Sequence, residues 1–206
     1  IIRQMGAMGL FGLPLPTEYG GQGKSYMHLC VAVEQLARVD QSIAVTLEAG
    51  LGLGAMPIYR FGTEEQKRTY LPSLARGEGL AAFGLTEAGA GSDAGATKTT
   101  ATLEDGWWTI DGTKQFITNS GTPITNLVTV TAVTGEVEKR DGSRGPELST
   151  IIVPVPIEGF TALPAYDKVG WHTSDTHPLV FDGVKVPEAN LLGERGRGFA
   201  NFLSVL

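Results

Sequence analysis

Hydrophobic positions in the first third of the chain recur at helical spacing. Leu29, Val33 and Leu36 fall on one face of a helix, with polar residues between them. A second stretch, from about 41 to 59, is rich in Ala, Leu and Gly, which is typical of a helix packed closely against its neighbours. The pattern therefore predicts a helical domain over residues 1–80.

The end of this region carries recognisable helix boundaries. Thr63 and Gln66 have the spacing of a capping box, in which each side chain bonds the backbone of the other residue. Pro72 is expected to end or kink the helix that follows, and Gly77 suits the position after its last turn. A helix between Thr63 and Gly77 is therefore predicted.

After Gly79 the pattern changes to short runs rich in β-branched residues, which favour strands. The predicted strands are 81–86, 97–103, 107–110, 115–118, 126–132, 150–155 and 179–181. Asp105-Gly106, Asp111-Gly112 and Asp182-Gly183 predict turns between them, and the polar stretch 139–146 predicts a solvated loop. Residues 81–194 are therefore expected to form an antiparallel β-barrel or sandwich domain.

The last residues predict the start of a further helix. Phe199, Phe202, Leu203 and Leu206 form a helical stripe that stops in mid-pattern, and the chain opens at Ile1 without an initiator Met. We expect residues 195–206 to begin a C-terminal helical domain and the chain to be part of a longer protein. The fold class is then α+β and multidomain.

Composition excludes several classes of function. The net charge is −6 and no basic run occurs, which argues against nucleic acid as a partner. No apolar run is expected to reach the ~20 residues of a membrane span. The single cysteine, Cys30, allows no intramolecular disulfide and is expected to be a small buried hydrophobe. Of the adjacent Trp107 and Trp108, strand alternation should bury one and expose the other.

Metal-binding and acid–base candidates are few. The three histidines lack the spacing of metal ligands, so no metal site is predicted. Glu87 and Asp93 lie in a tight connection, where carboxylates commonly cap backbone N–H groups or pair with a basic side chain. Both are therefore interpreted as structural rather than catalytic.

The segment from Phe83 to Asp93 carries the strongest chemical signal. Its glycines allow close approach of the backbone to a ligand, and successive N–H groups there could bind phosphate oxygens. The spacing is not that of the dinucleotide fingerprint, since Thr97 leads into a predicted strand and not a helix. By itself, a Gly-rich connection of this kind is more often structural than functional.

Five segments, spread over nearly the whole chain, are informative together. One is Gly84-Leu85-Thr86-Glu87, two residues and Ala90-Gly91-Ser92-Asp93, and another is Gln115-Phe116-Ile117-Thr118-Asn119. The others are 56–67, 168–176 and 181–199. Together they resemble the acyl-CoA dehydrogenase family, and they occur in the family's order. Ala88 stands where the family often has Pro, and Phe116 where it often has Trp. The resemblance implies FAD as the cofactor and α,β-desaturation of acyl-CoA thioesters.

The resemblance also implies roles for single residues. It places Phe83, Leu85, Thr86, Gly91, Ser92, Phe116, Ile117 and Thr118 at the flavin. Ser92 would also touch the substrate's pantetheine chain, and Thr118 would bond near the ring's N5. Relatives carry their catalytic Glu in the C-terminal domain, so no catalytic base is expected within this chain, which alone should bind flavin weakly and not turn over.

Two other functions remain open, an acyl-CoA oxidase of the same fold and a non-catalytic flavin-fold module for protein contact. For the dehydrogenase, the resemblance implies an electron-transferring flavoprotein as electron acceptor and a homotetramer. It also implies a cytoplasmic location in a bacterium or the mitochondrial matrix in a eukaryote. Acyl chain length and branching are not readable from these residues.

Overall fold

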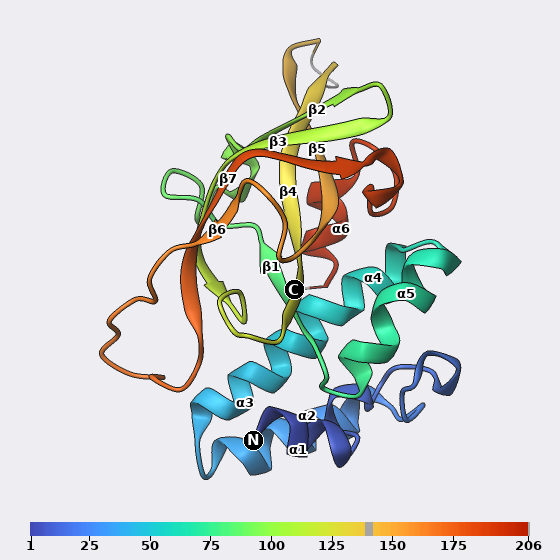
Figure 1. Ribbon diagram of the computed structural model, residues 1–206, viewed down its shortest axis with the longest axis vertical. Coiled ribbons are helices and arrows are strands. Elements are labelled where there is room, and N and C mark those ends of the chain that lie inside the picture. Colours follow the sequence, from blue (N-terminus) through green and yellow to red (C-terminus); the bar gives the residue numbers. More distant parts are fainter. Residues whose placement is uncertain (139–141, 206) are drawn as a thin grey trace.

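The computed structural model describes residues 1–138 and 142–205 of the chain. Its first part is helical and lies below the sheet in Figure 1. The helices there are α1 (Ile2–Ala7), α2 (Tyr26–Ala37), α3 (Gln41–Glu48), α4 (Met56–Phe61) and α5 (Glu64–Ala75). Since the first strand begins at Leu80, the predicted change from helices to strands near Gly79 is confirmed.

The capping box at the start of α5 is also confirmed. Gln66 N–H donates to the Thr63 hydroxyl at 3.2 Å, and Thr63 N–H donates to the Gln66 side-chain oxygen at 3.0 Å. Pro72 lies inside α5 and does not end it. Gly77, with φ of +62°, lies just after the helix and supplies the left-handed backbone that its end requires.

α3 and α4 are joined through a π-helical segment, Ala49–Ala55, into one long helix. Among the described residues this helix, Gln41–Phe61, is the one candidate for a membrane span by length and composition, although Glu48 and Arg60 interrupt its apolar sequence. Its apolar window is 72% buried within the molecule. A Cβ on Gly54 would lie 2.7 Å from the Ala81 carbonyl oxygen. The helix therefore packs directly on β1 backbone.

The strands form one curled sheet in the part of the chain that the structure describes. They are β1 (Leu80–Gly84), β2 (Thr100–Glu104), β3 (Trp107–Thr118), β4 (Thr125–Glu138), β5 (Arg144–Pro154), β6 (Phe160–Ala162) and β7 (Thr176–Pro187). The strand order is β1-β4-β2-β3-β7-β6, and β5 pairs with β4 outside this order. β1 and β2 each pair with β4 in parallel and the other pairs are antiparallel. The sheet is thus mixed, where an antiparallel one was expected.

Two of the three predicted turns are wrong. Asp105-Gly106 does join β2 to β3 as a tight turn. Asp111 instead lies within β3, opposite Asp182 and Gly183 within β7, where the register shifts by one residue. The Gly183 N–H donates to the Asp111 carboxylate at 2.8 Å. These Asp-Gly pairs therefore form a β-bulge, which bends and twists two long strands without ending them.

A second bulge occurs near the end of β3. Lys114 pairs with Leu179 and Ile117 pairs with His177, so Gln115 and Phe116 share one partner position on β7. Phe116 takes up the distortion with φ of +59°. Because of this extra residue, Ile117 is buried while Phe116 is 63% exposed. The bulge therefore turns Phe116 out of the core.

Two hydrophobic cores hold the molecule, one within the helices and one beneath the sheet. Trp108 is fully buried in the second core and Trp107 is exposed, so the predicted alternation is confirmed. Cys30, in contrast, is exposed on α2, and its prediction as a buried hydrophobe is wrong. The apolar stretch that contains it is a helix of which only Leu29 is buried.

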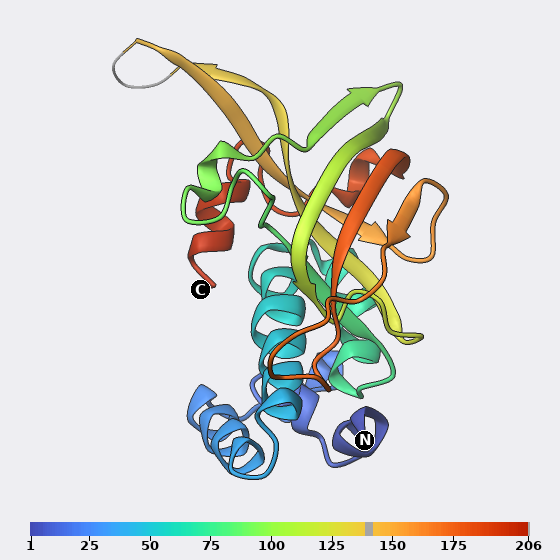
Figure 2. The same ribbon diagram turned by 90° about the vertical axis from the view of Figure 1, so that its left-hand side faces the viewer.

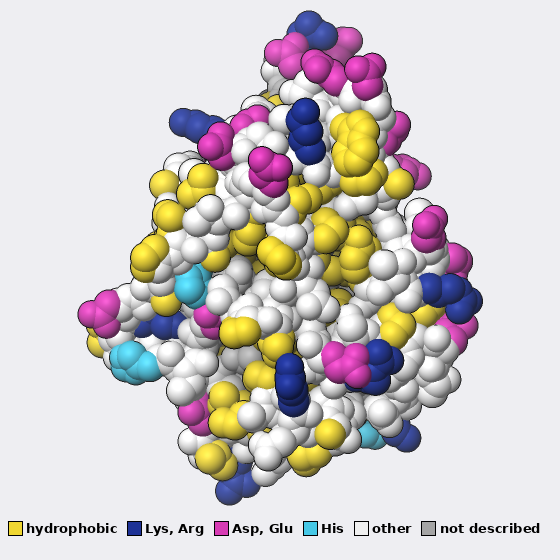
Figure 3. Space-filling model, in the orientation of Figure 1, with side chains coloured by type: hydrophobic (Ala, Val, Ile, Leu, Met, Phe, Trp, Pro, Cys, Tyr) yellow, Lys and Arg dark blue, Asp and Glu magenta, His cyan; other side chains and the backbone are white. Residues whose placement is uncertain are grey.

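The far end of the β4–β5 hairpin is charged, as Figure 3 shows at the top, whereas hydrophobic side chains gather in the hollowed middle of that face. Glu136 and Arg144 form an exposed ion pair there at 3.2 Å. The loop predicted over 139–146 falls partly outside the described residues, and Arg144 to Pro146 belong to β5. The polar composition reflects solvent exposure and not the absence of a strand.

The predicted C-terminal helix is present as α6 (Gly198–Leu203), which lies beside the β4–β5 face in Figure 2. Phe202 is buried and stacks on Phe83 of β1 with ring centroids 3.9 Å apart. Leu206, the last residue of the predicted stripe, lies outside the described residues. The aromatic stack fixes α6 against the edge strand.

A buried ion pair joins the connection after β1 to β3. The Lys114 ammonium, with no exposed side-chain surface, donates to a Glu87 carboxylate oxygen at 2.8 Å and to the Leu85 carbonyl at 3.2 Å. The Lys98 and Thr99 N–H groups donate to the same carboxylate at 2.8 and 3.0 Å. The pairing with a basic side chain and the capping of backbone N–H groups expected for Glu87 are therefore confirmed.

Breaking this pair from one side should destabilise the protein strongly. Lys114→Met leaves a buried carboxylate and Glu87→Gln leaves a buried ammonium, and each should cost about 3–5 kcal/mol of unfolding free energy. The double variant should cost less than either single change, because the introduced glutamine can still accept from the backbone while the introduced methionine fills the space of the lysine stem. Urea unfolding of the intact protein measures all three.

The matched control is Glu78→Gln, which breaks the solvent-exposed pair between Arg76 and Glu78. That change should leave the free energy of unfolding almost unchanged, because solvent screens an exposed ion pair. The unfolding cost of the Glu87→Gln/Lys114→Met variant is compared with the sum of the two single costs. If the two are equal, Glu87 and Lys114 are not energetically coupled and the prediction is contradicted.

The same pair predicts an acid-dependent loss of stability. Burial by itself raises the pKa of Glu87, but the hydrogen bonds from Lys114, Thr99 and Lys98 outweigh it and hold the pKa below the ordinary 4.5. Ionised Glu87 therefore stabilises the fold above that pH, and the contribution is lost as pH falls through the folded-state value. The cost of Glu87→Gln should be full near neutrality and shrink below about pH 4.5, as unfolding curves at stepped pH would show.

Candidate functional site

A cavity of about 420 Å³ lies where β1 and β3 end beside the long helix and α6. Its lining consists of Ala49, Leu53, Phe83, Leu85, Thr86, Gly91, Ser92, Ala94, Phe116, Ile117, Thr118 and Leu203. All eight residues predicted to contact a flavin are in this set. The structure thus brings the two predicted segments to one place, while their role as flavin ligands stays a prediction.

One wall is the connection that follows β1. Thr86 is half-buried and its carbonyl accepts from the Gln115 N–H at 2.8 Å, next to the Glu87–Lys114 ion pair. Further along, a Cβ built on Gly91 meets no atom within 4 Å, and Ser92 is exposed. The wall is therefore anchored at Thr86 and open at Gly91 and Ser92.

The second wall is the end of β3. The bulge places Phe116 at the surface of the cavity, where its ring stacks on Tyr166 with centroids 5.0 Å apart. The Tyr166 hydroxyl bonds the Gln115 side chain, which holds the loop between β6 and β7 against this wall. Ile117 is buried beneath it, and Thr118 is the last residue of the strand. An aromatic face and a hydroxyl therefore flank the cavity on this side.

The apolar end was not predicted from the sequence. Ala49 and Leu53 come from the π-helical segment, and Leu203 from α6. Their apolar character is that of ordinary packing residues, and only the docking of the long helix and α6 on the sheet makes them lining residues. The cavity thus has hydroxyl groups at Thr86, Ser92 and Thr118 on one side and hydrocarbon on the other.

Lys114, which supports the wall at Thr86, is another residue that the sequence did not reveal. It lies 27 positions from Glu87, so no local pattern connects them. Its burial lowers the pKa of the ammonium, which the hydrogen bond and charge of Glu87 oppose. The predicted strands 107–110 and 115–118 also left Lys114 between them, so no signal of its burial was present in the sequence.

The remaining acid–base candidates lie apart from one another. Asp93 is exposed and its side chain makes no capping bond to the short helix that follows, so its interpretation as a structural residue stays a prediction. His28 and His172 are exposed. No group of three or more metal-ligating side chains occurs in the searched residues, 1–138 and 142–205. Neither Glu87 nor Asp93 is among the residues that line the cavity, and the Glu87 carboxylate is held by Lys114 and two backbone N–H groups.

Comparisons with known proteins agree with this geometry. The family model described as "Acyl-CoA dehydrogenase, N-terminal domain" matches residues 1–78, and "Acyl-CoA dehydrogenase, middle domain" matches residues 82–184. A probable acyl-CoA dehydrogenase of Bacillus subtilis (strain 168) is 44% identical over 204 residues, covering 99% of this chain and 52% of that protein.

Solved structures are similar over the same length. Butyryl-CoA dehydrogenase from Megasphaera elsdenii has a TM-score of 0.90 and 40% identity, covering 99% of this chain and 52% of that one. Acyl-CoA dehydrogenase complexed with FAD from Bacillus anthracis has a TM-score of 0.89 and 38% identity, covering 99% and 33%. The chain spans about half the length of the curated relatives it matches first. Fold, cavity and sequence matches together show that the chain belongs to the acyl-CoA dehydrogenase family.

Proposed function

We propose that the intact protein catalyses FAD-dependent α,β-desaturation of acyl-CoA thioesters. The observation that carries this proposal is the cavity, in which all eight residues implied by the family resemblance meet. The relative from Bacillus anthracis, which is complexed with FAD, supports the choice of cofactor.

The residues present fit a flavin. The hydroxyls of Thr86 and Thr118 can bond heteroatoms of the ring without adding a full charge to the site. The open backbone at Gly91 and the Ser92 hydroxyl suit the pyrophosphate, because a ligand can approach a residue without Cβ closely. Phe116 offers an apolar ring face. Ser92 is also proposed to touch the pantetheine chain of the substrate.

When bound, the flavin supplies the redox chemistry by accepting a hydride from the substrate's β-carbon. The chain's own residues bind and orient the reactants, and the apolar end at Leu53 and Leu203 holds hydrocarbon away from water. Glu87 is poorly suited to remove the α-proton, because Lys114 and two backbone N–H groups already engage its carboxylate. We expect the base to come from the part of the relatives that this chain does not span.

The electron acceptor and assembly are part of the same proposal. A structure similar to this chain, with a TM-score of 0.90 and 42% identity, comes from a study of an electron transferring flavoprotein of Acidaminococcus fermentans. We propose a flavoprotein of this type as acceptor, a homotetramer as the assembly, and the cytoplasm or mitochondrial matrix as location.

The deciding experiment mixes the purified intact protein with a panel of acyl-CoA thioesters under anaerobic conditions. The expected result is a visible flavin spectrum that one or more thioesters bleach within the mixing time or soon after. Absence of flavin, before and after incubation with FAD, would favour the non-catalytic module. Rapid oxygen consumption on re-aeration would favour the oxidase over the dehydrogenase.

The hydroxyl of Thr118 provides a sharper prediction. Thr118→Val keeps the shape of the side chain and removes the donor, whereas Thr118→Ser keeps the hydroxyl. A lost hydrogen bond to a buried partner costs about 1–3 kcal/mol, so Thr118→Val should weaken FAD binding roughly 5- to 150-fold. Equilibrium titration with FAD and the visible spectrum of the bound flavin measure this effect.

Thr118→Ser is the matched control and should stay within about threefold of the wild type. A Thr118→Val protein with wild-type affinity and spectrum would remove Thr118 from the proposed ligands.

A further inference from the structure

The position of Thr118 depends on the turn that follows it. Thr118 ends β3 opposite Thr176 of β7, and the next residue, Asn119, is fully buried with φ of +63°. The Asn119 N–H donates to the Asp175 carbonyl at 3.1 Å, and the Thr125 hydroxyl donates to the Asn119 carbonyl at 2.8 Å. The chain thus leaves β3 in a left-handed conformation, which Asn tolerates and which these two hydrogen bonds hold in place.

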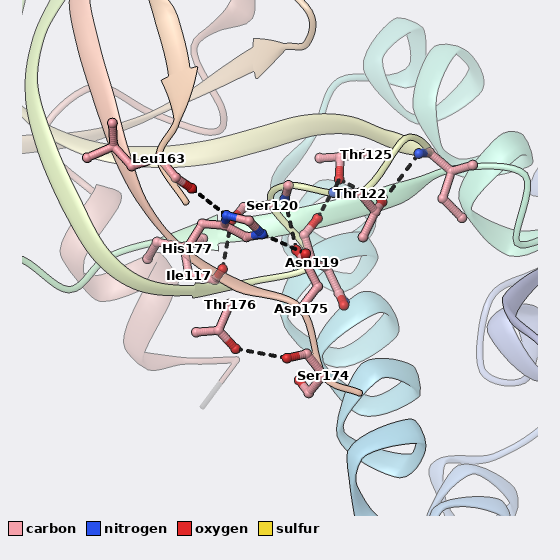
Figure 4. A network of polar contacts seen from close by, with 12 residues as sticks. Ile117, Asn119, Ser120, Thr122, Thr125, Leu163, Ser174, Asp175, Thr176 and His177 are labelled. Atoms are coloured by element: carbon pink, nitrogen blue, oxygen red, sulfur yellow. Dashed lines mark hydrogen bonds and ion pairs between the residues drawn. The ribbon is translucent and has the colours of Figure 1, made fainter. Parts of the chain in front are cut away.

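Asp175 and His177 supply contacts from the other strand (Figure 4). One Asp175 carboxylate oxygen accepts from the Gly121 N–H at 2.9 Å, and the other lies 2.7 Å from His177 Nε2. His177 Nδ1 in turn lies 2.5 Å from the Leu163 carbonyl oxygen. The imidazole therefore links the turn after β3 to the start of the loop between β6 and β7.

His177 contacts a partner through each of its two ring nitrogens. Nδ1 lies against the Leu163 carbonyl oxygen, which can only accept a hydrogen bond. Nε2 lies against an Asp175 carboxylate oxygen on the other side of the ring. One imidazole therefore bridges the end of β6 and the residue before β7.

The ring also contacts the turn sterically. A Cβ built on Gly121 would lie 2.3 Å from His177 Nε2, so the imidazole is packed directly against the turn backbone. The His177 side chain is 12% exposed. Movement of this ring would therefore displace the turn from Asn119 to Gly121, which continues directly from Thr118.

The loop between β6 and β7 is fastened at its outer end as well. Trp171 Nε1 donates to the Gln41 side-chain oxygen at 3.2 Å, and the Thr173 hydroxyl donates to the Asp40 carboxylate at 3.3 Å. Asn119 contributes a parallel link, since its side-chain amide donates to the Thr46 carbonyl at 3.2 Å. The turn is thus held between β7 and the first helix turns of α3.

We propose that His177 and Asp175 are positioning residues for the Thr118 hydroxyl, acting as a clamp on the turn Asn119–Gly121. The inference rests on the proposed flavin site, because the clamp matters for chemistry only if Thr118 bonds the cofactor. His177 and Asp175 themselves do not line the cavity. Their effect on the flavin therefore passes through Thr118.

A double-mutant cycle in the intact protein tests this route. His177→Ala should weaken FAD binding about tenfold and shift the visible spectrum of the bound flavin, as expected for one displaced hydrogen bond. In the Thr118→Val background the same change should have almost no further effect on affinity or spectrum, because the hydroxyl it positions is already gone. The matched control, His172→Ala, removes an exposed histidine of the same loop and should behave as wild type.

A second readout uses the protein without flavin. His177→Ala and Asp175→Asn should both speed amide hydrogen exchange at Asn119 and Gly121, while His177→Gln/Asp175→Asn should restore part of the protection through an amide–amide hydrogen bond. Unchanged exchange in the single variants, or additive effects of His177→Ala and Thr118→Val on FAD affinity, would overturn the inference. A wild-type protein that takes up no FAD would instead contradict the proposed function. The exchange measurement needs no FAD, so it tests the clamp separately from that function.

Discussion

The cavity depends on the burial of one charge. The Lys114 ammonium has no access to solvent, and its partners are the Glu87 carboxylate and the Leu85 carbonyl, both in the connection after β1. A buried charge without a partner is costly, so this connection must close onto β3 whenever the sheet forms. Thr86 lies between the two partners and its carbonyl bonds the neighbouring Gln115. The two walls of the cavity are therefore joined in a fixed relative position.

The helical part contributes the remainder of the site through close backbone contact. Gly54 and Ala81 approach so closely that a methyl group on the glycine would meet the strand carbonyl. Asn119 and Thr46 add a hydrogen bond between the same two parts. Because Ala49 and Leu53 lie on this helix, the apolar end of the cavity exists only when the helix is docked. Binding of the proposed acyl substrate would then depend on how the long helix packs against the sheet.

Much of this could be predicted from the sequence, for identifiable reasons. The change from helical to strand periodicity is a local signal, and so are the capping box and the family segments around Thr86 and Thr118. Asp111-Gly112 and Asp182-Gly183 were misread because turns and bulges both require the backbone freedom of glycine, and pairing across strands decides between them. The Glu87–Lys114 contact and the Asp175–His177 pair against Gly121 depend on distant segments meeting, which no single-sequence pattern encodes. Cys30 was misplaced because its helix is apolar on more than the buried face.

The bulge at Gln115 and Phe116 has a consequence for how this site can diverge. In an uninterrupted strand, side chains point alternately into the core and away from it. The positions that can face a ligand are then fixed by the positions that must stay in the core. The extra residue uncouples the two ends of β3. Before the bulge, the buried positions of β3 are Trp108, Ile110 and Lys114. After it, the alternation of buried and exposed positions starts again from the buried Ile117. Substitutions at Phe116 can thus alter the lining of the cavity without repacking the sheet, which makes this strand end an adaptable part of an otherwise constrained scaffold.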